Sequence, residues 1–255
     1  MHPACAENPG GRLWLAAAAV LGQAVALRPE SILALSRWQA RPGEALTVLA
    51  PDGSAFRARL QGGAGGVVIP FEALSASPES SLRLEICQAL PAKERFELVL
   101  EKLTELGVQR IVPFVSERSV TLAERDAGQK KSHRWPEVVR RAARQCRRAM
   151  LPELTAVLGW SQVLEQSRGA DARLMLYEAA VGQQPWGPKP FPATGRIVLL
   201  VGPEGGFTAG EVAQARAEGF LTLSLGPRIL RTETAAIVGA ALLQQTLGDL
   251  NLAVG

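Results

Sequence analysis

The stretch Ile-Val-Leu-Leu-Val-Gly-Pro-Glu-Gly-Gly-Phe at residues 197–207 decides the fold class. A run of apolar, strand-forming residues that leads directly into a glycine- and proline-rich turn is typical of a buried strand in an α/β protein. The same design recurs in Leu174–Ala179 and in Phe220–Ala235, where the strand residues are followed by Gly226 and Pro227. Ligands of open α/β sheets bind beyond the carboxyl ends of the strands, so these three turns predict one binding site.

Helical patterns alternate with strand patterns over residues 82–255. Apolar residues of the segment 96–106 recur at intervals of three and four, which predicts an amphipathic helix that ends at Gly107. Thr208 and Glu211 form a capping box before another helix, and Thr232–Leu247 predicts a helix that is apolar on most sides. With the strands expected at 84–90 and 108–115, this alternation predicts a mostly parallel sheet.

Residues 1–75 predict a separate small β domain. Strands are expected at Ala45–Leu49, Phe56–Leu60 and 67–69, with a turn at residues 51–54 and a hairpin loop in the glycine run 62–66. The stretch 75–81 has the composition of a linker. Leu13–Leu21 has the apolar character of a signal peptide, but Glu7 precedes it, and we expect residues 12–15 to form the first strand instead.

The composition excludes several classes of protein. The 255 residues are 47% hydrophobic and 20% charged, as in an ordinary globular protein, so extensive disorder is excluded. Three distant cysteines and two histidines exclude a disulfide framework, and we predict no metal site. The cysteines are typical of reduced thiols in a cytoplasmic protein, and no apolar run is long enough to span a membrane.

Positive charge is concentrated between Arg125 and Arg148, which hold nine Lys and Arg residues against Asp126 and Glu137. Much of it falls on the polar side of an amphipathic helix expected at residues 135–146. Two interpretations stay open at this point: a surface for a polyanion such as nucleic acid, or an ordinary solvated helix face.

Three motifs together resemble one known family. They are Gly-Pro-Glu-Gly-Gly-Phe at 202–207, Leu-Gly-Pro-Arg-Ile-Leu-Arg-Thr-Glu-Thr-Ala at 225–235, and Lys-Leu-Thr-Glu-Leu-Gly-Val at 102–108 with Ser-Glu-Arg-Ser at 116–119. The chain thereby resembles, over residues 93–247, the RsmE-type 16S rRNA (uracil-N3)-methyltransferases of the SPOUT class.

The resemblance implies an α/β SPOUT domain at 82–255 with a trefoil knot, preceded by a PUA-like β-barrel at 1–75 that contacts RNA. It also implies a homodimer with the last helix at the interface, and S-adenosylmethionine bound in the knot. The cofactor contacts that it implies fall on the three turns, at Leu176, Tyr177, Glu178, Gly202, Pro203, Glu204, Gly205, Gly206, Leu225, Gly226, Ile229 and Leu230.

The implied reaction is methylation of uridine N3 in 16S rRNA, either naked or in the assembled small ribosomal subunit. Uridine N3 must lose its proton before it attacks a methyl group, so the site needs a cation for the uracil anion and a proton acceptor. Arg231 is the candidate cation, and Glu204 or Glu233 is the candidate acceptor. The alternative for Arg231 is a structural ion pair with Glu233.

The chain departs from the family in its expected RNA contacts. The histidines that the family usually carries before Arg-Pro-Gly are absent from residues 32–40, where Arg37 is the remaining cation, and Arg144 replaces a usual glutamate. We therefore expect RNA phosphates to contact Arg37, Arg140, Arg141, Arg144, Arg147 and Arg148. Two further functions are considered: a SPOUT enzyme with another RNA target, and a non-catalytic RNA-binding factor of ribosome assembly.

Overall fold

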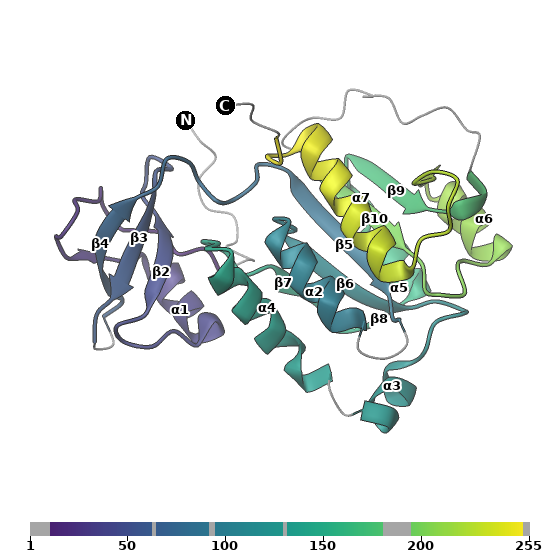
Figure 1. The fold of residues 1–255 in the computed structure, drawn as a ribbon, viewed down its shortest axis with the longest axis horizontal. Helices are drawn as coiled ribbons and strands as arrows, with labels where there is room; N and C mark the ends of the chain where they lie inside the picture. The colour runs from purple at the N-terminus through teal and green to yellow at the C-terminus, as the bar shows by residue number, and fades with distance from the viewer. Residues whose placement is uncertain (1–10, 63–64, 92–94, 130–131, 181–194, 252–255) are drawn as a thin grey trace. The chain divides into compact units, whose positions relative to one another are not determined.

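The computed structural model describes residues 11–62, 65–91, 95–129, 132–180 and 195–251 (Figure 1). The chain divides into two compact units, residues 1–79 with 140–153, and residues 80–139 with 154–255. We predicted one boundary between residues 75 and 82. The structure instead returns the chain to the first unit through residues 140–153, so that helix α4 (Trp135–Gln145) contributes residues to both units.

The second unit is built on a parallel sheet, as predicted. Its strand order is β11-β9-β10-β5-β6-β7, and β8 also pairs with β6. The pairs between β11, β9, β10, β5 and β6, and between β6 and β8, are parallel. The strands are β5 (Arg83–Ala89), β6 (Arg110–Val115), β7 (Glu153–Leu154), β8 (Leu158–Gly159), β9 (Ala172–Leu176), β10 (Arg196–Val201) and β11 (Leu221–Leu223).

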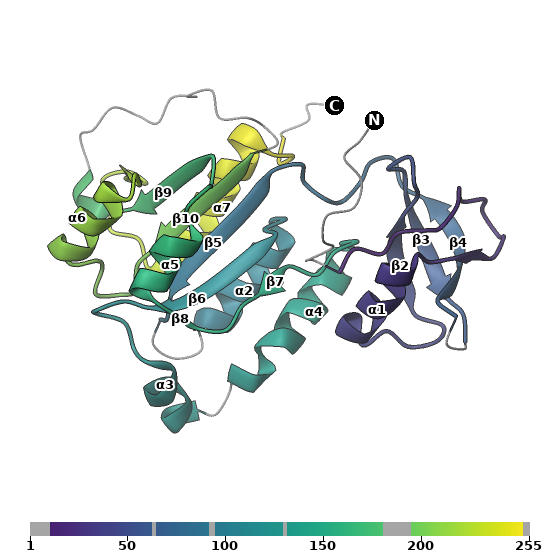
Figure 2. The ribbon, with the colours of Figure 1, turned by 180° about the vertical axis from the view of Figure 1, so that it is seen from behind.

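Helices cover both faces of this sheet (Figures 1 and 2). Because side chains alternate along a strand, Ile197, Leu199 and Val201 of β10 pack with helices α2 (Arg95–Glu105) and α7 (Thr232–Leu247). Val198 and Leu200 point to the other face and pack with α5 (Trp160–Gln166) and α6 (Ala209–Ala217). Burial on both faces explains why residues 197–201 of β10 form a continuous apolar run.

The expected helix boundaries agree with the structure. The helix at 232–247 has the predicted bounds, and α2 ends before Gly107, whose φ of 74° is left-handed. The Thr208 hydroxyl accepts from the Glu211 amide while the Glu211 carboxylate accepts from the Thr208 amide, so the capping box is confirmed. The other helical segments described in the second unit are α3 (Leu122–Gln129) and the 3-10 turns η1 (Ser132–Arg134) and η2 (Glu178–Ala180).

The first unit contains an antiparallel sheet in the order β1-β4-β3-β2. Its strands are β1 (Val25–Ala26), β2 (Ala45–Leu49), β3 (Ala55–Leu60) and β4 (Val67–Ala73). The predicted β3–β4 hairpin is present, although residues 63–64 of its glycine loop lie outside the described residues. Residues 12–15 do not form a full strand: Trp14 and Leu15 make isolated bridges to Leu49 and Leu27.

The first unit also has a helix that the sequence analysis missed, α1 (Pro29–Trp38). Pro29 begins the helix, and its buried face consists of Ser31, Ala34 and Trp38. Two of these three residues are small or polar, so no apolar stripe marks the face in the sequence. The Trp38 indole donates to the Gly11 carbonyl at 3.1 Å, and the Ser31 hydroxyl donates to the Arg12 carbonyl.

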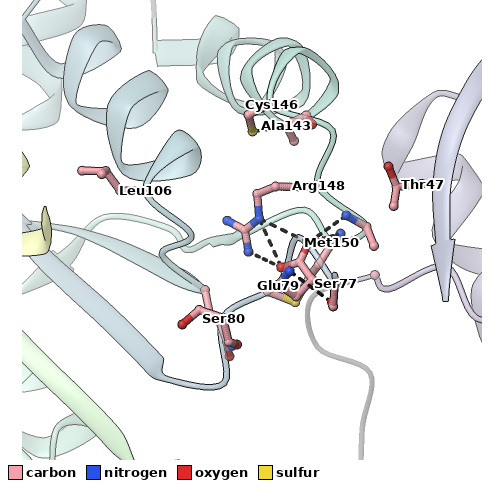
Figure 3. Close-up of polar contacts among 12 residues, drawn as sticks. Thr47, Ser77, Glu79, Ser80, Leu106, Ala143, Cys146, Arg148 and Met150 are labelled. Atoms are coloured by element: carbon pink, nitrogen blue, oxygen red, sulfur yellow. Dashed lines mark hydrogen bonds and ion pairs between the residues drawn. The ribbon is translucent and has the colours of Figure 1, made fainter. Parts of the chain in front are cut away.

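The Glu79 carboxylate holds residues 148–150 within the first unit (Figure 3). It accepts from the Arg148 guanidinium at 2.8 Å and from the amides of Ala149 and Met150 at 2.7 and 3.0 Å. The Arg148 and Glu79 side chains are only 2% and 5% exposed. The segment 75–81, which was predicted as a linker, therefore contains a buried carboxylate that binds residues 148–150. In the described part of the chain, no helix is long and apolar enough to cross a membrane.

We expect Glu79→Ala to lower the free energy of unfolding by about 3–5 kcal/mol, because it leaves a buried guanidinium without its carboxylate. Urea-induced unfolding followed by tryptophan fluorescence measures the change. Glu165→Ala, which removes an exposed carboxylate from α5, is the matched control and should change stability by less than about 0.5 kcal/mol. Equal unfolding midpoints for the two variants would show that the Glu79–Arg148 ion pair does not stabilise the fold.

Candidate active site

Three loops meet at one edge of the parallel sheet. They follow β9, β10 and β11, which are adjacent in the sheet and run in the same direction, so their carboxyl ends lie together. The loops line a cavity of about 430 Å³. The structure thus brings together all twelve residues expected to contact the cofactor: Leu176, Tyr177, Glu178, Gly202, Pro203, Glu204, Gly205, Gly206, Leu225, Gly226, Ile229 and Leu230.

Two glycines give these loops a backbone path that other residues rarely follow. Gly206 has a φ of 65°, and a Cβ there would lie 3.2 Å from the Glu178 carboxylate. Gly226 has a φ of 106°, where an L-amino acid is strained. The cavity wall at these two points is therefore backbone.

The 202–207 loop is held at its far end by aromatic packing and by the 116–119 motif. Phe207 is buried, with its ring 5.7 Å from Trp160 and 6.5 Å from Phe114. The Arg118 guanidinium donates to the Gly205 carbonyl at 3.0 Å, and the Glu117 amide donates to Glu211 Oε1 at 2.9 Å. The 116–119 motif therefore supports the loop from outside the cavity.

A buried hydrogen-bond network joins the same loop to the first turn of α7. The Thr232 hydroxyl donates to the Gly202 carbonyl at 2.5 Å, and Gln88 Nε2 donates to Thr232 Oγ1 at 2.9 Å. Gln88 and Thr232 are both buried, so the network is shielded from water. It fixes the distance between two walls of the cavity, and the sequence analysis missed both residues.

Arg95, at the start of α2, makes a second connection between these walls. Its guanidinium lies 3.6 Å from the Glu204 carboxylate and 3.7 Å from the Glu233 carboxylate, and its side chain lines the cavity. The sequence analysis missed Arg95, because the two carboxylates lie more than a hundred positions away in sequence. No local spacing could have associated the three residues.

The candidate catalytic residues differ in position. Arg231 and Glu204 line the cavity and are exposed, whereas Glu233 is buried, does not line it, and pairs with Arg95. The alternative of an Arg231–Glu233 ion pair is therefore wrong. Within the described residues, Arg231 has no ion-pair partner. It precedes the first turn of α7, so its guanidinium and the positive end of the helix dipole occupy the same edge of the cavity.

The residues expected to bind RNA are not equivalent. Arg37, Arg141 and Arg147 are exposed, and Arg140 is half-buried. The Arg144 guanidinium donates to Glu44 at 2.6 Å and to the Trp38 carbonyl. These contacts explain why this chain has an arginine at the position where the family usually has a glutamate. Arg148 is 3% exposed and bound to Glu79, so the expectation that it contacts RNA is corrected. The helix ends at Gln145, and Arg147 has a left-handed φ of 61° before the buried Arg148.

Comparison with known proteins places this architecture in a family. The model of the RNA methyltransferase domain matches residues 78–244. The chain is 35% identical to ribosomal RNA small subunit methyltransferase E of Mycobacterium bovis over 205 residues, 78% of this chain and 77% of that protein. It is 34% identical to the Synechocystis protein of the same name over 201 residues, 78% of this chain and 65% of that protein.

A solved structure agrees with these sequence matches. The Neisseria gonorrhoeae ribosomal RNA small subunit methyltransferase E, bound to S-adenosyl methionine, superimposes with a TM-score of 0.67 at 31% identity. The match covers 94% of this chain and 99% of that one. The chain belongs to the ribosomal RNA small subunit methyltransferase E family of RNA methyltransferases.

Proposed function

We propose that the protein methylates N3 of a uridine in the 16S rRNA of the small ribosomal subunit, with S-adenosylmethionine as methyl donor. The observation that carries this proposal is the convergence of the three loops on one cavity, in a chain 31% identical to a structure bound to S-adenosyl methionine. The cytoplasm, where ribosomal subunits are assembled, is the proposed location.

The cavity fits a cofactor of this kind. Its volume lies within the range of about 300–1,000 Å³ that is usual for cofactor sites. Backbone at Gly206 and Gly226 leaves room for a close ligand, while Leu176, Leu225 and Ile229 provide apolar wall. Glu178 and Glu204 add two carboxylates suited to the positive groups of the cofactor.

The bound cofactor supplies an electrophilic methyl group, and the chain's residues must prepare the uridine. We assign Arg231 to the developing uracil anion, because its guanidinium lies at the cavity edge beside the N-terminus of α7. We assign Glu204 as the acceptor of the N3 proton, because it lines the cavity. Glu233, which we considered for the same task, is assigned to positioning Arg95, because it is buried and its carboxylate lies 3.7 Å from that guanidinium.

Three finer expectations belong to the same proposal: a trefoil knot in the C-terminal unit, a PUA-like barrel in the N-terminal unit, and a homodimer through the last helix. The antiparallel four-stranded sheet of the first unit is compatible with the barrel. Leu242 of α7 and Leu98 of α2 are 46% and 43% exposed, on helices that pack together, and they support an apolar dimer contact at α7.

The direct test is methyl transfer from labelled S-adenosylmethionine to bacterial small ribosomal subunits that lack N3-methyluridine. We expect label in 16S rRNA and one new reverse-transcription stop at a uridine, because N3 methylation blocks the Watson–Crick edge. Naked 16S rRNA is the parallel substrate. Label at a ribose would indicate a SPOUT enzyme with another target, and cofactor binding without transfer to any RNA would indicate a non-catalytic factor.

Gly226→Ala should weaken S-adenosylmethionine binding about tenfold or more, because alanine at this φ costs about 1–3 kcal/mol and moves the loop. Isothermal titration calorimetry measures the affinity. Gly210→Ala, on α6, is the matched control: a Cβ there would meet nothing closer than Thr208 Oγ1 at 3.9 Å. Unchanged affinity in Gly226→Ala would remove the 225–230 loop from the proposed cofactor site.

Arg231→Ala should lower the rate of methyl transfer about a hundredfold or more while cofactor affinity stays unchanged, because it removes the cation that faces the uracil anion. Single-turnover methylation and calorimetry separate the two effects. Arg216→Ala, which removes an exposed arginine from α6, controls for net charge. A normal rate in Arg231→Ala would exclude the assignment.

A further inference from the structure

The Arg95 guanidinium lies near two carboxylates but beyond hydrogen-bond distance of both. Its Nη1 atom is 3.6 Å from the Glu204 carboxylate, and its Nε atom is 3.7 Å from the Glu233 carboxylate, whereas donor and acceptor are usually about 2.7–3.2 Å apart. The side chain is 39% exposed and lines the cavity. Among the described residues, no hydrogen bond uses its donors, so they stay available for a ligand.

Glu233 ties this cation to helix α7. The Glu233 side chain is 12% exposed, and its Oε2 atom is buried without a hydrogen-bond partner among the described residues. A buried carboxylate is costly unless a cation compensates its charge, so Glu233 depends on Arg95. Glu204 is exposed in the 202–207 loop and has no such need. The guanidinium can therefore turn from Glu204 to a ligand while Glu233 keeps it in place.

Arg95 and Arg231 approach the same end of α7. Arg231 immediately precedes the helix, and Glu233, the partner of Arg95, lies in its first turn. Helices α2 and α7 pack together on one face of the sheet (Figure 1), and Arg95 begins α2. The positive end of a helix dipole disfavours cations. Two arginines placed against these dipoles, and lining one cavity, suit a ligand that carries negative charge.

The proposed substrate develops negative charge at two atoms. Uracil N3 lies between two carbonyl groups, and loss of its proton leaves a charge that both carbonyl oxygens share. Fixed donors stabilise such an anion where its charge develops, so a site with a donor for each oxygen stabilises it more than a site with one. Arg231 is assigned to the uracil anion and can face one of the two oxygens, which leaves the other oxygen without a donor.

We propose that Arg95 is a second catalytic arginine, which donates to the other carbonyl oxygen of the target uracil. This inference rests on the proposed function. Glu204 then accepts the N3 proton beside Arg95, since a cation and a carboxylate 3.6 Å apart can contact neighbouring atoms of one pyrimidine edge. The N3 electron pair forms the bond to the methyl carbon, and the electrons of the broken carbon–sulfur bond stay on sulfur. Glu233 is a positioning residue that acts through Arg95.

The same three groups distinguish uracil from cytosine. Arg95, Glu204 and Arg231 present a donor, an acceptor and a donor, which complement the oxygen, the N3 proton and the oxygen of the uracil edge. Cytosine has an amino donor at position 4 and no proton on N3. An arginine at position 4 would then face another donor, and Glu204 would face a lone pair, so cytosine does not fit this arrangement.

The test measures single-turnover methyl transfer from labelled S-adenosylmethionine to small ribosomal subunits that lack N3-methyluridine, with cofactor affinity measured by calorimetry. Arg95→Ala should lower the rate about a hundredfold at unchanged cofactor affinity, because a charge-assisted hydrogen bond to the anion is lost. Arg95→Lys should lower the rate about tenfold, because the ammonium keeps the charge but not the planar fork that reaches Glu233 and the uracil together.

Lys102→Ala is the matched control on the same helix. It removes a cation that pairs with Glu101 at 2.8 Å and with Glu105 at 2.9 Å and does not line the cavity, so the rate should stay normal. Glu233→Gln should lower the rate about tenfold in the wild-type background and cause no further loss in Arg95→Ala, because its effect passes through Arg95.

Subunits from bacteria grown with 5-fluorouracil separate stabilisation of the anion from a structural role. Fluorine withdraws electrons from the ring, so fluorouridine loses its N3 proton more easily and depends less on the cations. The defect of Arg95→Ala relative to wild type should therefore shrink about fivefold or more on these subunits. A variant that only displaces the loops should show the same defect on both kinds of subunit.

Thermal unfolding verifies each variant, and Arg95→Lys keeps the test valid if Arg95→Ala fails to fold. A normal rate in Arg95→Ala, with an active wild type, would overturn this inference alone. An equal defect on both kinds of subunit would also overturn it, and a parallel loss of cofactor affinity would then assign Arg95 to the cofactor. No transfer by the wild type to any RNA would overturn the proposed function, and this inference with it.

Discussion

Parallel pairing of β11, β9 and β10 is the constraint on which the candidate active site depends. Antiparallel neighbours would send alternate loops to opposite edges of the sheet, whereas parallel neighbours deliver all three loops to one edge. The Gln88–Thr232–Gly202 network and the Arg95 contacts then hold the loops at fixed separation. The parallel direction of the strands thus brings the three loops together, and the side-chain contacts then fix the spacing of the cavity walls.

Much of this could be predicted from the sequence, because the relevant signals are local. The apolar run 197–201, the capping box at Thr208 and the apolar helix 232–247 each reflect burial or capping within a few residues. The three loops were located for the same reason, since glycine and proline mark turns directly. Their meeting at one edge follows from the parallel sheet, and the cavity includes every residue that was expected to contact the cofactor.

The missed features depend on contacts between distant residues. Helix α1 buries Ser31 and Ala34, so its inner face has no apolar pattern. Arg148 has the sequence spacing of an exposed helix residue. The helix has already ended, however, and the Arg148 guanidinium donates to the Glu79 carboxylate after the left-handed residue Arg147. Arg95 and Gln88 gain their roles from residues that follow more than a hundred positions later. The return of residues 140–153 to the first unit has no signature in composition or periodicity.

The order of the strands affects how the nascent chain can fold during translation. β10 lies between β9 and β5 in the sheet, yet it is synthesised after both of them. Until residues 90–195 have left the ribosome and β10 can be inserted, one edge of β5 has no partner strand. Unpaired apolar edges invite association with other nascent chains. Translation of this protein therefore passes through an interval in which a chaperone would protect the central strand.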